Sequence, residues 1–216
     1  GTDCMIKGCI FDMDGTLLDS MKFWIDCGKN FVLKNNLVPE EGLSKKLFCM
    51  SLNDGNAYLQ KKYFPDSSAE EVGKGVAAEI ADAYKYSVEP KSGARELLER
   101  LYTKKIKCAL ATATPRNLFE PAFERLGLTK YFSVILTCPE LNTHKDVPLI
   151  YEKSAQLLGT HPGETAVFED ALFAATTAAR AGFYTVGVFD ELSADDSFEM
   201  KKICNEYLKT PGDFVI

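Results

Sequence analysis

The sequence lacks an excess of positive charge, because 31 Asp and Glu residues outnumber 25 Lys and Arg residues and the net charge is −6. A protein with this balance has no broad basic face to neutralise the phosphates of a nucleic acid or an anionic membrane surface. Long hydrophobic runs are also lacking, since no stretch approaches the roughly 18 apolar residues of a membrane-spanning helix. We therefore expect neither a nucleic-acid partner nor a membrane partner.

Cysteine spacings typical of a structural framework are lacking as well. The seven cysteines are odd in number, scattered, and never form a Cys-x-x-Cys pair: Cys4, Cys9, Cys27, Cys49, Cys108, Cys138 and Cys204. This pattern argues against a disulfide scaffold or a zinc ribbon and favours reduced thiols. The first residues also lack the basic segment and apolar stretch of a secretory signal, so the expected location is cytoplasmic.

What is present is the composition of an ordinary globular protein, with 216 residues of which 46% are hydrophobic. Five short apolar runs have the length of buried strands: 5–11, 106–111, 134–136, 165–168 and 184–189. Helical segments alternate with them, one starting at Pro115 behind the N-cap candidate Thr114 and one ending before Gly182. The alternation predicts an α/β fold whose parallel sheet is covered on both faces.

Residues 18–87 interrupt this alternation, because they show amphipathic helical patterns and no convincing strand. Ser68 and Glu71 have the spacing of a capping box, and residues 63–66 mark a break before that helix. We expect an all-helical domain at 18–87 inserted into a catalytic core of residues 1–17 and 88–216. At the C-terminal end we expect a helix from Ser197 and a last strand at 213–216.

Two carboxylates follow the first apolar run, in the segment Asp12-Met13-Asp14-Gly15-Thr16. Side chains two residues apart on an extended segment point the same way, and ligands of open α/β sheets bind beyond the carboxyl ends of the strands. A calcium loop of the EF-hand type does not fit, since it needs Gly and Glu at positions that here hold Leu17 and Phe23. The segment therefore predicts a site where both acids converge on one ligand.

The segment Asp12–Ser20 resembles the first motif of the haloacid dehalogenase superfamily of phosphotransferases. Three later elements resemble the other motifs in order and spacing: Thr112 at the end of a strand, Lys145 at the start of a later helix, and the pair Glu169-Asp170 after another strand. The helical insert is similar to the cap of the β-phosphoglucomutase-like and phosphoglycolate-phosphatase-like branch. The resemblance implies a Rossmann-like core with that cap.

Gathered carboxylates require a cation, because two charges 4 Å apart repel by about 4 kcal/mol at an effective dielectric constant near 20. Mg²⁺ suits carboxylates together with a substrate phosphate. The resemblance implies Asp12 and Asp170 as side-chain ligands and Asp14 as a ligand through its carbonyl. Glu169 is expected not to bind the metal directly, and to act on it through contacts with these ligands or through a water.

The resemblance also implies the reaction, which is hydrolysis of a small phosphomonoester, expected to be a sugar phosphate, through an aspartyl-phosphate. Asp12 is the expected nucleophile and Asp14 the general acid and base. Lys145 is expected to hold the charge on the transferred phosphoryl group, with the Thr112 hydroxyl and the backbone at Ala113 completing the cradle. Dehalogenases of the superfamily lack the second acid, so Asp14 argues against that activity.

Two alternatives stay open. A sugar phosphomutase of the β-phosphoglucomutase type would usually carry a His four residues beyond Ser20 and an Arg in the cap loop, where this chain has Trp24 and Leu52. The second alternative is a family member without catalytic activity that only binds ligands. Trp24 and Asn53 are our candidates for substrate contacts from the cap, with packing inside the cap as the competing interpretation for Trp24. We expect a monomer whose partner is a small phosphorylated metabolite.

Just beyond Thr112, Arg116 has two interpretations. It could bind substrate, or it could be an exposed charge of the following helix.

Overall fold

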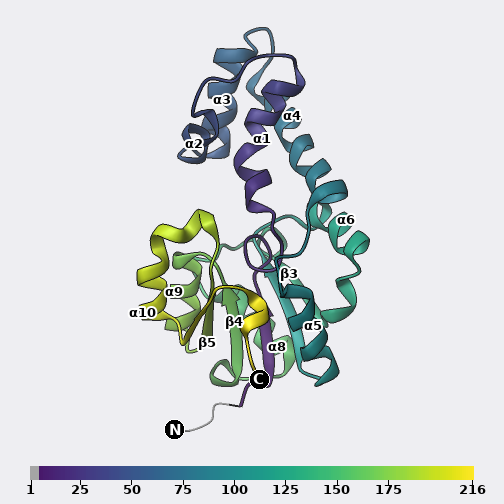
Figure 1. The fold of residues 1–216 in the computed structure, drawn as a ribbon, viewed down its shortest axis with the longest axis vertical. Helices are drawn as coiled ribbons and strands as arrows, with labels where there is room; N and C mark the ends of the chain where they lie inside the picture. Colours follow the sequence, from purple (N-terminus) through teal and green to yellow (C-terminus); the bar gives the residue numbers. More distant parts are fainter. Residues whose placement is uncertain (1–4) are drawn as a thin grey trace. The chain divides into compact units, whose positions relative to one another are not determined.

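The computed structural model describes residues 5–216, so Cys4 lies outside the described residues. The chain divides into two units, one made of the residues up to Asp19 together with Glu89–Ile216, the other of Ser20–Val88 (Figure 1). The junctions predicted from the sequence lie after residue 17 and after residue 87. No helix among the described residues is long and apolar enough to cross a membrane.

The first unit is built on a parallel sheet, which has six strands in the described part of the chain and the order β3-β2-β1-β4-β5-β6. The strands are β1 Gly8–Phe11, β2 Lys107–Thr112, β3 Val134–Thr137, β4 Thr165–Glu169, β5 Tyr184–Val188 and β6 Glu206–Leu208. The strand order reverses between β1 and β4, and such a switch point is where doubly wound sheets bind ligands. The predicted α/β fold with a Rossmann-like core is confirmed.

Helices cover both faces of this sheet. They are α5 Ala94–Thr103, α6 Arg116–Leu126, α7 Cys138–Leu141, α8 Leu149–Leu158, α9 Leu172–Arg180 and α10 Ser197–Ile203. One face buries Ile10 and Val167 with Tyr151 of α8 and Ala178 of α9. The next residues along the strands, such as Phe11, point to the opposite face. Burial on both faces explains why these strands read as continuous apolar runs.

The opposite face of the sheet has an aromatic core. The rings of Phe11 and Phe168 stack with centroids 4.3 Å apart, and Phe132 meets the Phe11 ring edge-on at 6.3 Å. Phe119 and Phe123 bring α6 onto the same cluster, because Phe123 lies 5.7 Å from Phe132. The two strands that precede the acidic motifs, β1 and β4, are therefore held side by side by their own aromatic residues.

Two local expectations are wrong. The last strand is β6, which pairs Val186 with Glu206, and not residues 213–216. The apolar end of the chain packs instead of pairing, since the buried Phe214 meets Phe168 edge-on at 4.9 Å. The N-cap position of α6 is occupied by Pro115 and not by Thr114, whose hydroxyl binds elsewhere.

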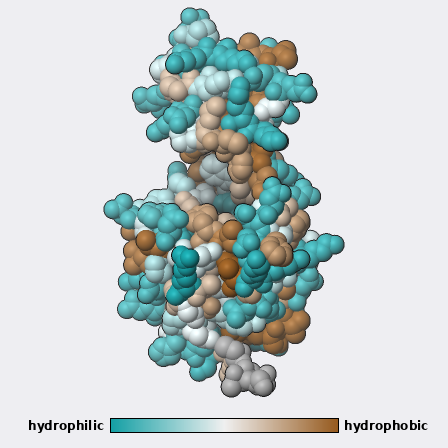
Figure 2. Space-filling view, turned by 90° about the vertical axis from the view of Figure 1, so that its left-hand side faces the viewer, coloured by the Kyte–Doolittle hydropathy of each residue, from teal (hydrophilic) through white to brown (hydrophobic). Residues whose placement is uncertain are grey.

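The second unit, Ser20–Val88, contains helices and no strand among its residues, as expected. The helices are α1 Met21–Lys34, α2 Leu43–Phe48, α3 Leu52–Tyr63, α4 Ala69–Asp82 and the π-helical turn η1 Ala83–Ser87. The capping contact is confirmed, because the Ser68 hydroxyl accepts a hydrogen bond from the Glu71 N–H at 3.1 Å. On the face shown in Figure 2, hydrophilic residues dominate each unit and apolar residues form separate patches.

Candidate active site

The turn after β1 forms the centre of the site. The Asp12 N–H donates to the Phe168 carbonyl at 3.0 Å, which extends the pairing of β1 with β4 by one residue. The N–H groups of Leu17 and Leu18 both donate to the Met13 carbonyl at 2.9 Å and close the turn. Gly15 has a φ of +83°, a conformation that residues with a side chain rarely adopt. The glycine of the motif is thus required by the turn itself.

Three carboxylates meet at this edge of the sheet. Oxygens of Asp12, Glu169 and Asp170 lie within 4.8 Å of one another. Phe11 is in register with Phe168, so the residues that follow in the two strands, Asp12 and Glu169, become neighbours. Asp12 is 9% exposed and Glu169 only 1% exposed, which makes this a buried acidic cluster.

Lys145 joins two members of the cluster. Its Nζ donates to Asp12 Oδ1 at 2.6 Å and to Glu169 Oε1 at 2.7 Å, and the residue is 5% exposed. Burial by itself lowers the pKa of Lys145, but the charges of Asp12 and Glu169 outweigh it and raise the pKa well above its ordinary value. Lys145 is therefore a permanent buried cation between the carboxylates.

The crowding of acids affects their protonation. Burial, followed by the charge of Asp12, raises the pKa of Glu169 to about 8, against the opposing effect of Lys145. The same two causes raise the pKa of Asp170 well above its ordinary value. Both shifts mean that the site resists further negative charge. A divalent cation relieves this repulsion, and three convergent carboxylates are the hard oxygen donors that Mg²⁺ prefers, so the residues fit the predicted metal.

Two residues of the cluster were missed or left without a role in the sequence analysis. The Tyr151 hydroxyl, fully buried in α8, donates to Glu169 Oε1 at 2.6 Å. Burial and the charge of Glu169 raise the pKa of Tyr151, which keeps the hydroxyl a neutral donor. Thr16 donates to Asp12 Oδ2 at 2.9 Å and lies 3.4 Å from Asp170 Oδ1. Thr16 belongs to the first motif, whereas Tyr151 looks like an ordinary apolar-face residue in the sequence.

Asp14 has a different partner from the other acids. Its Oδ2 accepts a hydrogen bond of 2.6 Å from the Thr114 hydroxyl, and its side chain is not part of the three-acid cluster. The Thr114 N–H in turn donates to Thr112 Oγ1 at 3.1 Å. Thr112 is buried at the end of β2, and Ala113 after it is exposed. The turn after β2 thus orients Asp14 and presents the backbone at Ala113.

The two cap candidates lie in the other unit. Trp24 in α1 donates from its indole Nε1 to the Tyr84 hydroxyl at 2.8 Å, and the two rings lie edge-on with centroids 6.4 Å apart. Asn53 is exposed in the first turn of α3. Trp24 therefore packs within its own unit, and substrate contact by Trp24 or Asn53 stays a prediction.

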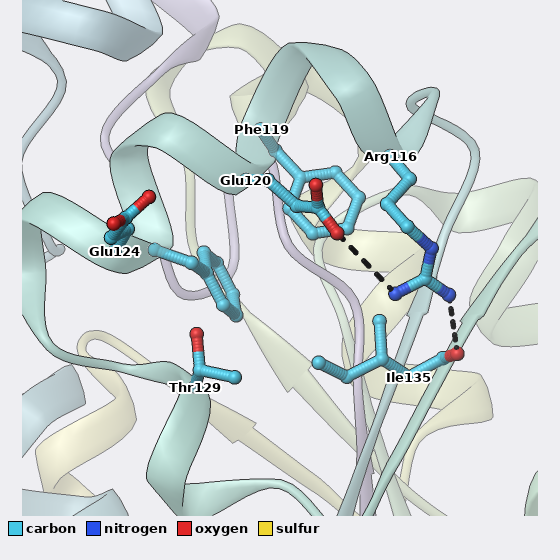
Figure 3. Close-up of a pocket in the computed structure, with 7 residues that line it drawn as sticks. Arg116, Phe119, Glu120, Glu124, Thr129 and Ile135 are labelled. Atoms are coloured by element: carbon cyan, nitrogen blue, oxygen red, sulfur yellow. Dashed lines mark hydrogen bonds and ion pairs between the residues drawn. The ribbon is translucent and has the colours of Figure 1, made fainter.

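Arg116 has protein partners of its own. Its Nε donates to Glu140 at 2.7 Å, and Nη2 donates to the Ile135 carbonyl at 2.9 Å. Figure 3 shows the guanidinium directed to Ile135 and Glu120 beside a cavity of about 270 Å³ that α6 and β3 line. Arg116 is thus engaged in ion pairs and hydrogen bonds that tie α6 to β3 and α7.

Residues 9–188 match the model of a protein family, the haloacid dehalogenase-like hydrolases. The chain therefore belongs to this family, and the resemblance predicted from the motifs is confirmed, together with the class of enzyme. Among solved structures it is similar to a Thermotoga maritima protein with a provisional β-phosphoglucomutase designation, at a TM-score of 0.86 and 27% identity over 96% of each chain. This similarity agrees with the predicted branch of the family.

Several curated relatives of the chain are named as phosphatases. A phosphorylated carbohydrates phosphatase from Thermotoga maritima is 29% identical over 189 residues, which cover 87% of this chain and 88% of the relative. Fructose-1-phosphate phosphatase YqaB from Escherichia coli is 27% identical over 188 residues, covering 84% and 95% of the two chains. These relatives favour a phosphomonoester hydrolase over the mutase alternative.

Proposed function

We propose that this protein is a Mg²⁺-dependent phosphatase that hydrolyses small phosphomonoesters, with sugar phosphates as the substrate class. The observation that carries the proposal is the buried Lys145, whose ammonium group lies 2.6 Å from Asp12 and 2.7 Å from Glu169. A nucleophilic carboxylate beside a fixed cation suits attack on a phosphoryl group. The substrate class is supported by the curated relatives, two of which are named for phosphorylated carbohydrates and fructose 1-phosphate.

Mg²⁺ would be held by the side chains of Asp12 and Asp170 and by the carbonyl of Asp14, with Glu169 acting through a water. When bound, the ion supplies positive charge that reduces the repulsion between the Asp12 carboxylate and the substrate phosphate. The proposal is supported by the 4.8 Å grouping of the carboxylate oxygens and by the raised pKa values of Glu169 and Asp170.

Two displacements then complete the reaction. In the first, a carboxylate oxygen of Asp12 forms a bond to phosphorus, the bond between phosphorus and the ester oxygen breaks, and Asp14 gives its proton to the departing alkoxide. In the second, Asp14 takes a proton from water, whose oxygen attacks the phosphorus and displaces the Asp12 carboxylate. The products are an alcohol and inorganic phosphate, and both aspartates return to their starting states.

The remaining residues stabilise the negative charge of the phosphoryl group and keep the reacting carboxyl groups in position. Lys145 restrains one oxygen of Asp12 and offers positive charge to the phosphoryl oxygens. Thr112 and the backbone at Ala113 form the cradle for those oxygens. Thr114 holds the Asp14 carboxyl at 2.6 Å and limits the positions from which it can exchange a proton.

Water is the proposed acceptor because the features of a mutase cap are missing. The cap segment has Leu52 where such mutases usually carry an Arg, so a second substrate phosphate finds no cation there. Trp24 stands where they usually carry a His. The binding-module alternative is weakened because the nucleophile, the second acid, the lysine and the acidic pair are all present.

The test is phosphate release from a panel of small phosphate esters, with added Mg²⁺ and with a chelator. The panel includes β-glucose 1-phosphate, for which glucose 6-phosphate is measured as well. We expect release that needs Mg²⁺ and that falls to about 1% or less in Asp12→Asn, because the nucleophile is lost. Asp195→Asn, a charge-matched change at an exposed residue, is the control and should behave like the unmodified protein. Isomerisation faster than release would favour the mutase instead.

A further inference from the structure

Lys91 is a nearly buried lysine to which the reaction above assigns no role. Its side chain is 14% exposed. The Nζ donates to the Gly15 carbonyl at 2.8 Å, to the Phe189 carbonyl at 2.7 Å and to Asp190 Oδ2 at 3.1 Å. These three acceptors use all three N–H groups of an ammonium ion.

The acceptors belong to two segments that are far apart in the sequence. Gly15 is the left-handed residue of the turn that carries Asp12 and Asp14. Phe189 and Asp190 directly follow β5, the strand beside β4. Lys91 therefore connects the turn of the first motif to the carboxyl end of β5.

The backbone around Lys91 holds the same turn from its other end. The Lys91 N–H donates to the Leu17 carbonyl at 2.8 Å, and the Asp19 N–H donates to the Glu89 carbonyl at 2.9 Å. Leu18 and Pro90 form an antiparallel bridge between these two contacts. Residues 89–91 thus run alongside residues 17–19, and the Lys91 side chain reaches back to Gly15.

Asp190 is positioned independently of Lys91. It is buried, and its Oδ1 accepts a hydrogen bond from the Leu192 N–H at 3.0 Å, which fixes the carboxylate at the start of the next turn. Its Oδ2 is left for Lys91. A lysine held at a fixed carboxylate and a strand-end carbonyl is a rigid donor for the third acceptor, Gly15.

We propose that Lys91 is a positioning residue of the active site, which holds the Gly15 carbonyl against the end of β5 and thereby fixes the turn that presents Asp12 and Asp14. The inference rests on the proposed function, because it assigns Lys91 a role in that reaction. Lys91 does not touch the reacting atoms and acts through the turn. Small displacements of a nucleophile and of a proton donor reduce the rate much more than they reduce substrate binding.

The first test compares Lys91→Met with Lys104→Met, which removes an exposed lysine whose Nζ also donates to a backbone carbonyl, that of Ile216, at 2.8 Å. For Lys91→Met we expect kcat to fall at least tenfold while KM stays within twofold. For Lys104→Met we expect both constants to stay within twofold of the unmodified enzyme. Equal kcat values in the two variants would overturn the proposal.

A second variant separates positioning from neutralisation of Asp190. Lys91→Met leaves the Asp190 carboxylate buried without its cation, which can destabilise the fold. In Lys91→Met combined with Asp190→Asn both charges are gone, and Asn keeps the oxygen that binds Leu192. We expect the melting temperature of this double variant to recover while kcat stays at least tenfold low. Recovery of kcat together with stability would mean that Lys91 only neutralises Asp190, and the proposal would be wrong.

Hydrogen exchange tests the inference without any activity. In the double variant we expect peptides that cover residues 12–19 to exchange at least fivefold faster, while peptides from α8 and α9 keep their rates. Unchanged exchange in residues 12–19 would overturn the positioning role. If the unmodified protein hydrolyses no ester of the panel, the proposed function fails, and exchange alone then decides whether Lys91 holds the turn.

Discussion

The hydrogen bond between Tyr151 and Glu169 allows the buried cluster to be tested by removing a single oxygen atom. Tyr151→Phe removes the hydroxyl that donates to Glu169 Oε1 at 2.6 Å and keeps the ring that packs in the core. A hydrogen bond contributes about 0.5–1.5 kcal/mol between neutral groups and about 1.5–3 kcal/mol to a charged group. Lys145 still donates to the same oxygen, so the acceptor keeps one donor. Because burial raises the pKa of Glu169 to about 8, the carboxylate is charged only above that pH, and at pH 9 we expect a loss of about 2 kcal/mol in the free energy of unfolding.

The measurement is urea denaturation followed by circular dichroism, with thermal unfolding beside it. A loss of about 2 kcal/mol corresponds to a fall of roughly 4–8 °C in Tm for a chain of this size. Tyr102→Phe is the matched control, because Tyr102 is 58% exposed and its change should stay within about 0.5 kcal/mol. If Tyr151→Phe changed the free energy of unfolding no more than this control does, the reasoning about the buried cluster would be refuted.

Two further predictions concern Thr114 and Gly93. Thr114→Val removes the donor that binds Asp14 at 2.6 Å, so kcat should fall about tenfold with KM unchanged. Steady-state assays measure both constants, and a kcat equal to that of the unmodified enzyme would contradict this role. Gly93 has a φ of +82°, and a Cβ there would meet the Gly212 backbone N at 2.7 Å, whereas Gly127, with a φ of +65°, faces open space. Gly93→Ala should therefore lower the free energy of unfolding by at least about 1 kcal/mol more than Gly127→Ala, which carries only the backbone strain. Equal losses in denaturation curves would show that the close contact has no effect.

The strands that could be predicted are those buried on both faces. The run 165–168 is buried throughout, with Val167 packed in the cluster of Tyr151 on one face and Phe168 stacked on Phe11 on the other. β6 was missed since it is a short, half-buried strand at the edge of the sheet that contains Glu206. The apolar end at Phe214 was mistaken for it, because local hydrophobicity does not tell whether a segment pairs with a strand or packs on a face.

In the candidate site, the residues inside recognisable motifs were found and their supporting residues were not. Asp12, Lys145 and Glu169 were named from the order and spacing of the motifs, and the fold brings them together. Tyr151 and Lys91 carry no local signal. Tyr151 acts on a residue 18 positions away, and Lys91 on one 76 positions away, so each function exists only through its distant partner.

Thr114 shows that a residue with the pattern of a helix cap can take a different role in the folded chain. Its place before Pro115 is typical of a helix cap, yet the hydroxyl binds a carboxylate 100 residues away at 2.6 Å. The local pattern predicts only an acceptor for the first N–H groups of the helix, whereas the partner of the hydroxyl depends on where the turn after β1 places Asp14.

We could predict three things from residue order alone: the alternation of strands and helices, the place of the helical insert, and the chemical groups of the first motif and its companions. These properties depend on residue type and short-range spacing, which a linear pattern records. Three facts depend on the folded chain: which oxygen each donor binds, the place of Lys145 between two carboxylates, and the hydrogen bond of Lys91 to the Gly15 carbonyl. Such contacts depend on strand order and register, because the sheet brings segments separated by many residues within hydrogen-bond distance.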